Sequence, residues 1–145
     1  MKTIKTSELT GAALDWVVAK CEGLDVGAVS ARKAAHRMAW ENASAPPLKE
    51  PDLTEYLNRF WANVFIDESG DRRAMPKYSV NWAISGLIIE RELLCITPDV
   101  QGARWMASMN SADLIRFGLT PLISAMRCYV ASKLGDEIEI PEELI

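Results

Sequence analysis

The chain has 145 residues, of which 49% are hydrophobic, and this is sufficient for one domain with its own core. Its formal net charge of −4 gives no general attraction to phosphate backbones or anionic membrane surfaces, so nucleic-acid binding is disfavoured. The three cysteines include no close pair, which argues against a disulfide framework or a cysteine-rich zinc site. No apolar run near the N-terminus is long enough for an export signal or a membrane span, so we expect a cytoplasmic protein.

The first predicted element is a helix from about Ser7 to Cys21. Thr6 or Ser7 can cap its first amides, and Gly23 supplies its end. Its core stripe follows helical spacing and consists of Leu14, Val17, Val18 and Cys21. Trp16 falls nearly opposite that stripe, so we expect it to find a second partner or to face solvent.

Residues 28–40 predict a second, alanine-rich helix. One side of it carries Arg32, Lys33, His36 and Trp40. A basic face with an aromatic side chain could hold a phosphate or a nucleic-acid strand, although an ordinary solvated face is the favoured interpretation in an acidic chain. His36 is the only histidine, which excludes a multi-histidine metal site, and no metal ligand is expected.

A proline-rich linker over residues 42–51 leads to a third predicted helix, where Asp52 and Glu55 form a capping box. Its apolar stripe is Leu53, Tyr56, Leu57, Phe60, Trp61 and Val64. So many large side chains on one stripe favour a core role, and a partner-binding helix is the alternative. We expect residues 67–77 to form a charged loop.

Residues 79–94 are apolar on all sides of a helical wheel, so we predict a break at Gly86 with a second short helix from Leu87. Strands are predicted over residues 93–97 and 103–109, joined by a turn at 98–102.

The last helix has a signal at each end, because Thr120 can cap it, Pro121 suits its first position and Gly135 suits its end. Residues 137–141 favour a short edge strand that Pro141 terminates. Together these elements predict an α+β fold. In it, the first and last helices flank a small, mainly antiparallel sheet in a sandwich-like arrangement.

Five side chains form a hypothetical ligand-binding set: Trp16, Asn81, Trp82, Trp105 and Arg127. Core packing is the default role of Trp82 and Trp105, and a wall of a ligand site is the alternative. We expect Trp16 and Trp82 to meet in a second small apolar cluster. Arg127 borders the apolar stripe of the last helix. Its stem could cover the core edge, or its guanidinium could pair with an anionic ligand or a partner's carboxylate.

Three segments resemble the NinX family of small proteins from lambdoid phages. They are "ELTGAALDWVVAK" near the N-terminus, "YSVNWAISGLIIERE" in the middle and "TPLISAMRCYVASKLGDEIEIPEEL" at the end. The resemblance covers residues 1–23 and 78–145, so we interpret residues 24–77 as a helical insertion within a single NinX-like domain of residues 1–145. The family usually has aspartate at the position of Asn81 and Gly-Gly-Pro at residues 85–87, which weakens any chemical role for a charge at position 81.

This resemblance implies an α+β sandwich and an accessory protein of unknown function, made in the cytoplasm of an infected bacterium. We expect a non-enzymatic protein that binds a host protein or a small host metabolite and so interferes with host machinery; homo-oligomerisation is compatible with this.

The alternative is a small enzyme acting on a nucleotide-like anion, with Asp15 and Glu90 as conceivable acid and base. Binding is favoured because the chain carries no Walker loop, dinucleotide fingerprint, serine-nucleophile motif or metal-ligand spacing. No cofactor and no catalytic residue are predicted.

Overall fold

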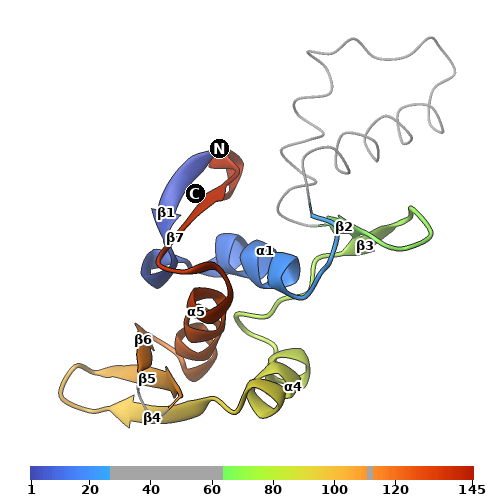
Figure 1. Ribbon diagram of the computed structural model, residues 1–145. Coiled ribbons are helices and arrows are strands. Elements are labelled where there is room, and N and C mark those ends of the chain that lie inside the picture. Colours follow the sequence, from blue (N-terminus) through green and yellow to red (C-terminus); the bar gives the residue numbers. More distant parts are fainter. Residues whose placement is uncertain (27–63, 111–112) are drawn as a thin grey trace, which may run out of the picture.

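The computed structural model describes residues 1–26, 64–110 and 113–145, which form helices and three small antiparallel sheets (Figure 1). The predicted α+β class is therefore confirmed. In chain order the elements are β1 (Lys2–Lys5), η1 (Thr6–Glu8), α1 (Gly11–Cys21), β2 (Val64–Ile66), β3 (Arg72–Ala74), α4 (Trp82–Glu92), β4 (Cys95–Asp99), β5 (Arg104–Met109), β6 (Leu114–Gly118), α5 (Pro121–Leu134), β7 (Glu137–Ile140) and η2 (Glu142–Leu144).

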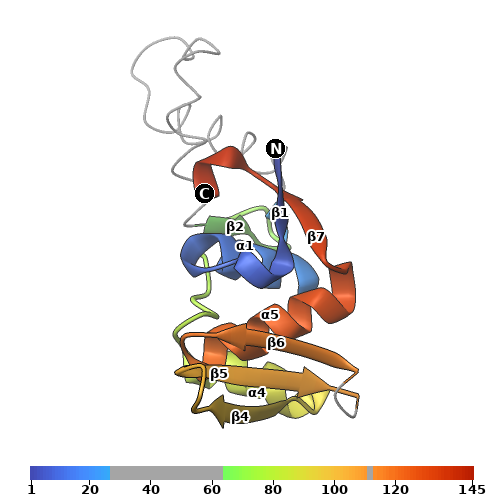
Figure 2. The same ribbon diagram turned by 90° about the vertical axis from the view of Figure 1, so that its left-hand side faces the viewer.

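Helix α5 is the centre of the molecule. One side of it packs on the β4–β5–β6 sheet, and α1 packs on another side, as both views show (Figures 1 and 2). The expectation that α1 and α5 flank the sheet is therefore wrong, because α5 lies between the sheet and α1. Its buried residues explain this position, since they surround most of the helix rather than form one stripe: Leu122, Ser124, Ala125, Met126, Cys128, Tyr129, Val130 and Ala131.

The three-stranded sheet has the order β4–β5–β6, and each neighbouring pair is antiparallel. The predicted strand at 103–109 and its pairing with the preceding strand are confirmed. The preceding strand begins at Cys95 rather than residue 93, because Leu93 ends α4 in a left-handed conformation with φ of 55°. Strand β6 was not predicted, and Gly118 at its end lies opposite Trp105 on β5.

Helix α4 runs without interruption through Gly86, so the predicted break there is wrong. Apart from its two chain neighbours and the backbone of α4, no atom lies within 4 Å of the position that a Cβ on Gly86 would occupy. The helical wheel of residues 79–94 is apolar on all sides because the side of α4 that faces solvent also carries apolar side chains. Trp82 and Leu87 are exposed, whereas Ser85 and Ile88 are buried against the rest of the molecule.

The two chain ends form a ribbon in which β1 pairs with β7, in register from Lys2 opposite Ile140 to Lys5 opposite Glu137. The predicted edge strand after the last helix is therefore confirmed, and its partner β1 was not foreseen. The Thr6 hydroxyl extends the ribbon by donating to the backbone oxygen of Gly135 at 3.0 Å.

Strands β2 and β3 form a hairpin around a turn in which the Asp67 carboxylate accepts the backbone N–H groups of Ser69 and Asp71. The prediction of a loop over residues 67–77 is therefore wrong for residues 72–74, which form β3. Val64, which the apolar stripe assigns to the third predicted helix, begins β2 instead. The helices predicted for 28–40 and from Asp52, with most of the proposed 24–77 insertion, lie outside the described residues. Within the described part of the chain, no helix is long and apolar enough to cross a membrane.

Candidate functional site

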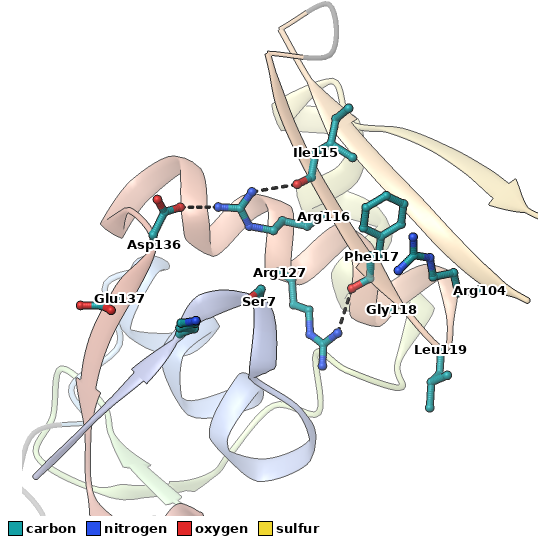
Figure 3. Close-up of a pocket in the computed structure, with 11 residues that line it drawn as sticks. Ser7, Arg104, Ile115, Arg116, Phe117, Gly118, Leu119, Arg127, Asp136 and Glu137 are labelled. Atoms are coloured by element: carbon teal, nitrogen blue, oxygen red, sulfur yellow. Dashed lines mark hydrogen bonds and ion pairs between the residues drawn. The ribbon is translucent and has the colours of Figure 1, made fainter. Parts of the chain in front are cut away.

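A pocket of about 740 Å³ lies along the edge of β6 that faces away from β5, beside the end of β1 and the start of β7 (Figure 3). This volume is within the usual range of about 300–1,000 Å³ for small-molecule sites. The residues that line it are Lys5, Ser7, Arg104, Ile115, Arg116, Phe117, Gly118, Leu119, Arg127, Asp136 and Glu137. Four of these side chains are cationic and two are carboxylates, in a chain whose net charge is −4.

Arg127 connects three segments of the chain at the pocket wall. Its Nε–H donates to the backbone oxygen of Leu9 at 2.7 Å. Its Nη1 donates to the backbone oxygen of Phe117 at 2.8 Å (Figure 3). A guanidinium has five N–H donors, so three remain after these two bonds. Among the described residues no carboxylate pairs with it. Burial lowers the pKa of Arg127 from its usual value, yet an arginine keeps its charge in proteins. The charge of the Glu8 carboxylate partly opposes this lowering, but among the described residues no carboxylate forms an ion pair with the half-buried Arg127 guanidinium.

Arg116 is held across the other part of the pocket. Its guanidinium donates to the backbone oxygen of the preceding residue, Ile115, at 2.8 Å. It also donates to the carboxylate of Asp136, the residue just before β7 (Figure 3). Its side chain is only 18% exposed, and its buried Nε has no hydrogen-bond partner in the structure. Because Asp136 already compensates its charge, we assign Arg116 a role in shaping the pocket wall rather than in binding an anion.

Arg104 presents a flat cationic surface. Its guanidinium lies 3.7 Å from the centre of the Phe117 ring, which covers one of its faces. Its Nε donates to the carboxylate of Asp99, the residue opposite Arg104 in the β4–β5 register, at 2.8 Å. These two contacts hold the guanidinium in place while the side chain remains 44% exposed.

Of the five predicted ligand-binding residues, Arg127 lines this pocket and the others lie elsewhere. Trp16 is 2% exposed in the main core and donates its indole N–H to the backbone oxygen of Val26 at 3.0 Å. Trp105 is half-buried on β5 opposite Gly118, one strand away from the pocket edge. The structure therefore does not assemble these five side chains into one site.

Trp82 is 55% exposed and belongs neither to the core nor to the side chains packed against it. The predicted core role of Trp82, and its predicted apolar cluster with Trp16, are therefore wrong. The physical reason is the continuous α4 helix, which turns Trp82 outward at its first position.

Asn81 is the N-cap of α4 and accepts the backbone N–H of Ala83 at 3.0 Å. Asparagine and aspartate serve equally as caps, so position 81 has a structural role.

The two conceivable catalytic carboxylates are in different environments, and neither lines the pocket. Asp15 is buried and accepts the backbone N–H of Ser79 at 2.7 Å. Burial raises the pKa of Asp15, and the bond from Ser79 and the charge of Lys77 partly oppose this. Glu90 is exposed on α4. The thiols of Cys21 and Cys128 are not activated nucleophiles, since burial raises the pKa of each to about 11.

Lys5, Arg104 and Arg116 line the pocket but were not predicted as site residues from the sequence. Arg104 was visible only as an alternating residue of a predicted strand, and Arg116 lies on the strand that was not predicted. Three arginines in the 24 positions from 104 to 127 are a weak signal until the pairing of β5 with β6 is known. In the described residues no group of three or more His, Cys, Asp or Glu side chains could hold a metal ion.

Comparison with models of known protein families shows a match to one family. The model of the family described as Bacteriophage P22, NinX matches residues 5–133, which is most of the chain. This match confirms the resemblance carried by the three sequence segments. No curated protein matches the chain in sequence.

Proposed function

The chain belongs to the bacteriophage P22 NinX family, and from this premise we propose that this phage accessory protein binds a small anionic molecule of the host cell. Binding rather than catalysis is the mode of action. Removal of that molecule from solution would be the means by which the phage interferes with host machinery.

The observation that carries this proposal is Arg127. Burying a charged group is costly unless it is paired, and among the described residues Arg127 has two backbone oxygens and no carboxylate as partners. Its three remaining N–H donors suit a carboxylate or phosphate, which a guanidinium binds in bidentate geometry. Lys5 adds a second cation at the same pocket. An anion bound there would give Arg127 the direct ionic partner that it lacks among the described residues.

The enzymatic alternative has less support. An acid and a base must both reach the reacting group, to within about 3 Å or through one water. Asp15 is buried with one oxygen bonded to Ser79, Glu90 is exposed on α4, and neither lines the pocket that contains Arg127. The described residues therefore provide anion-binding groups at the pocket without an acid–base pair of the kind that the sequence had suggested.

The direct test is to purify the native protein, unfold it and identify the released small molecules by mass spectrometry. We expect about one equivalent of an anionic compound. A blank would contradict a tightly bound metabolite and favour a host protein as the partner.

A pair of variants on β1 tests the location. Lys5→Glu reverses a pocket charge and should weaken binding of the released anion about fivefold or more. Lys2→Glu makes the same change on the same strand outside the pocket and should bind normally. Equal effects of the two variants would place the anion elsewhere.

A further inference from the structure

The pocket combines two kinds of recognition group, one for charge and one for a flat ring. Arg127 and Lys5 supply the charge, and the stacked pair of Arg104 and Phe117 supplies the flat surface. We propose that the anion is a mononucleotide, with its phosphate at Arg127 and Lys5 and its base stacked on Arg104. This inference rests on the proposed anion-binding function and specifies the ligand class of the same pocket.

The argument for a base begins with the geometry of Arg104. Phe117 covers one face of its guanidinium at 3.7 Å, and Asp99 fixes its Nε edge at 2.8 Å. The guanidinium is thus held over the ring of Phe117, and the side chain, which is 44% exposed, remains accessible to a second ring. Planar nucleobases stack on arginine planes and on aromatic rings because each presents a polarisable flat surface.

The argument for a phosphate comes from Arg127 and Lys5, which line the same pocket. A phosphate has several oxygens that can accept hydrogen bonds, and Arg127 has three N–H donors beyond its two backbone bonds. Lys5 and the hydroxyl of Ser7 line the same part of the molecule, where β1 meets η1. A phosphate monoester carries up to two negative charges, which suits a pocket with two cations, Arg127 and Lys5, that form no ion pair among the described residues better than a single carboxylate does.

The surroundings restrict the ligand to one nucleotide rather than a strand. A strand needs a basic track along which successive phosphates can lie. Here Asp136 and Glu137 line the pocket beside the cations, and the whole chain carries a net charge of −4. Additional phosphates would meet carboxylates and an acidic surface, so a mononucleotide fits this charge distribution best.

The test is isothermal titration of the full chain with three kinds of probe. These are the four ribonucleoside 5′-monophosphates, the corresponding nucleosides, and ribose 5-phosphate, which has the phosphate without a base. We expect at least one nucleotide to bind about tenfold more tightly than both its nucleoside and ribose 5-phosphate.

Two arginine variants identify the stacking surface. Arg104→Ala should reduce nucleotide affinity to that of ribose 5-phosphate and leave ribose 5-phosphate affinity unchanged. Arg73→Ala is the matched control, because Arg73 also pairs through Nε with an aspartate, Asp67, at 2.8 Å, but lies on β3 outside the pocket. It should leave both affinities unchanged, and both variants should melt within a few degrees of the wild type.

The outcomes separate this inference from the proposed function. If ribose 5-phosphate binds as tightly as every nucleotide, the base position is wrong while an anion-binding pocket stands. If no probe binds but the unfolded protein releases a different anion, the nucleotide is excluded and anion binding again stands. If no probe binds and nothing is released, both proposals fail.

Discussion

Arg127 on α5 donates its Nε–H to the backbone oxygen of Leu9, which lies 118 positions earlier in the chain. Through Nη1 the same side chain also reaches Phe117 on β6. One guanidinium therefore connects the segment before α1, the central helix and the sheet edge. The cation that we assign to anion binding is also a structural tie between these segments.

Arg127→Lys tests this double role. A lysine ammonium cannot reproduce two separately directed bonds from Nε and Nη1, so one of the two backbone oxygens should lose its partner. We expect the free energy of unfolding to fall by about 1–2 kcal/mol in urea denaturation. Ribose 5-phosphate binding should weaken in the folded variant as well. An unchanged unfolding free energy would show that the two bonds contribute little, and unchanged binding would remove Arg127 from the anion site.

Substitution by alanine at two glycines, Gly118 and Gly86, should change the stability of the protein in opposite directions. Gly118→Ala places a Cβ 2.6 Å from the backbone nitrogen of Ser124 and 2.8 Å from a methyl of Ile123, so β6 and α5 must separate. We expect a loss of about 1–3 kcal/mol. Gly86→Ala meets no atom within 4 Å and removes a flexible residue from inside α4, so it should add about 0.5–1 kcal/mol. Thermal melting of both variants is the measurement, and shifts of the same sign would contradict the packing described for one of them.

The tryptophans Trp16 and Trp82 should differ in their effect on stability. Trp16→Ala removes a buried ring and its bond to Val26, so we expect a loss of about 3–5 kcal/mol. Trp82→Ala removes a ring that is 55% exposed, so we expect less than about 1 kcal/mol. Denaturant titrations of the two variants measure both values. A large loss for Trp82→Ala would mean that α4 does not turn this side chain outward.

Asp15 should make the protein less stable as the pH rises. Its folded pKa is raised above the ordinary value of 3.8, chiefly by burial, so the folded state holds its proton over a pH range in which the unfolded state has lost it. The free energy of unfolding attributable to Asp15 therefore falls as the pH rises from about 3.8 through the folded pKa, and is constant above it.

Asp15→Asn removes this titration and keeps an oxygen that can accept from Ser79. The difference in unfolding free energy between variant and wild type should consequently shift in favour of the variant as the pH rises across that window. A difference that is flat with pH would show that the carboxyl titrates normally.

The local signals for the last helix were reliable, whereas those for the start of the first helix were wrong. Helix α1 begins at Gly11 rather than Ser7, and Thr6 does not cap it because its hydroxyl donates to Gly135. Thr120 caps α5, Pro121 occupies its first turn and Gly135 ends it, all as predicted, because capping involves groups within one turn. Gly86 was misjudged because the helical preference of one glycine is only about 1 kcal/mol, less than the packing of a whole helix supplies.

Features that depend on distant segments could not be predicted in the same way. Strand β6 has five residues with an arginine at its centre, and it becomes a strand by pairing with β5. The pocket requires β6, β1 and the start of β7 to lie together, and no periodicity within any one of them indicates this. Arg127 was singled out as a helix-border arginine, but its bonds to Leu9 and Phe117 depend on that assembly.

The ribbon of β1 and β7 has a consequence for synthesis on the ribosome. Thr6 bonds to Gly135, 129 positions later, and Lys2 to Lys5 pair with residues made later still. At typical translation rates of about 5–20 residues per second, the first strand waits on the order of ten seconds for its partner. During that time the first strand and one wall of the pocket stay incomplete. The pocket is therefore incomplete until Asp136 and Glu137, which line it, have been synthesised, so an anion can be held by the complete pocket only after residue 137 has been made.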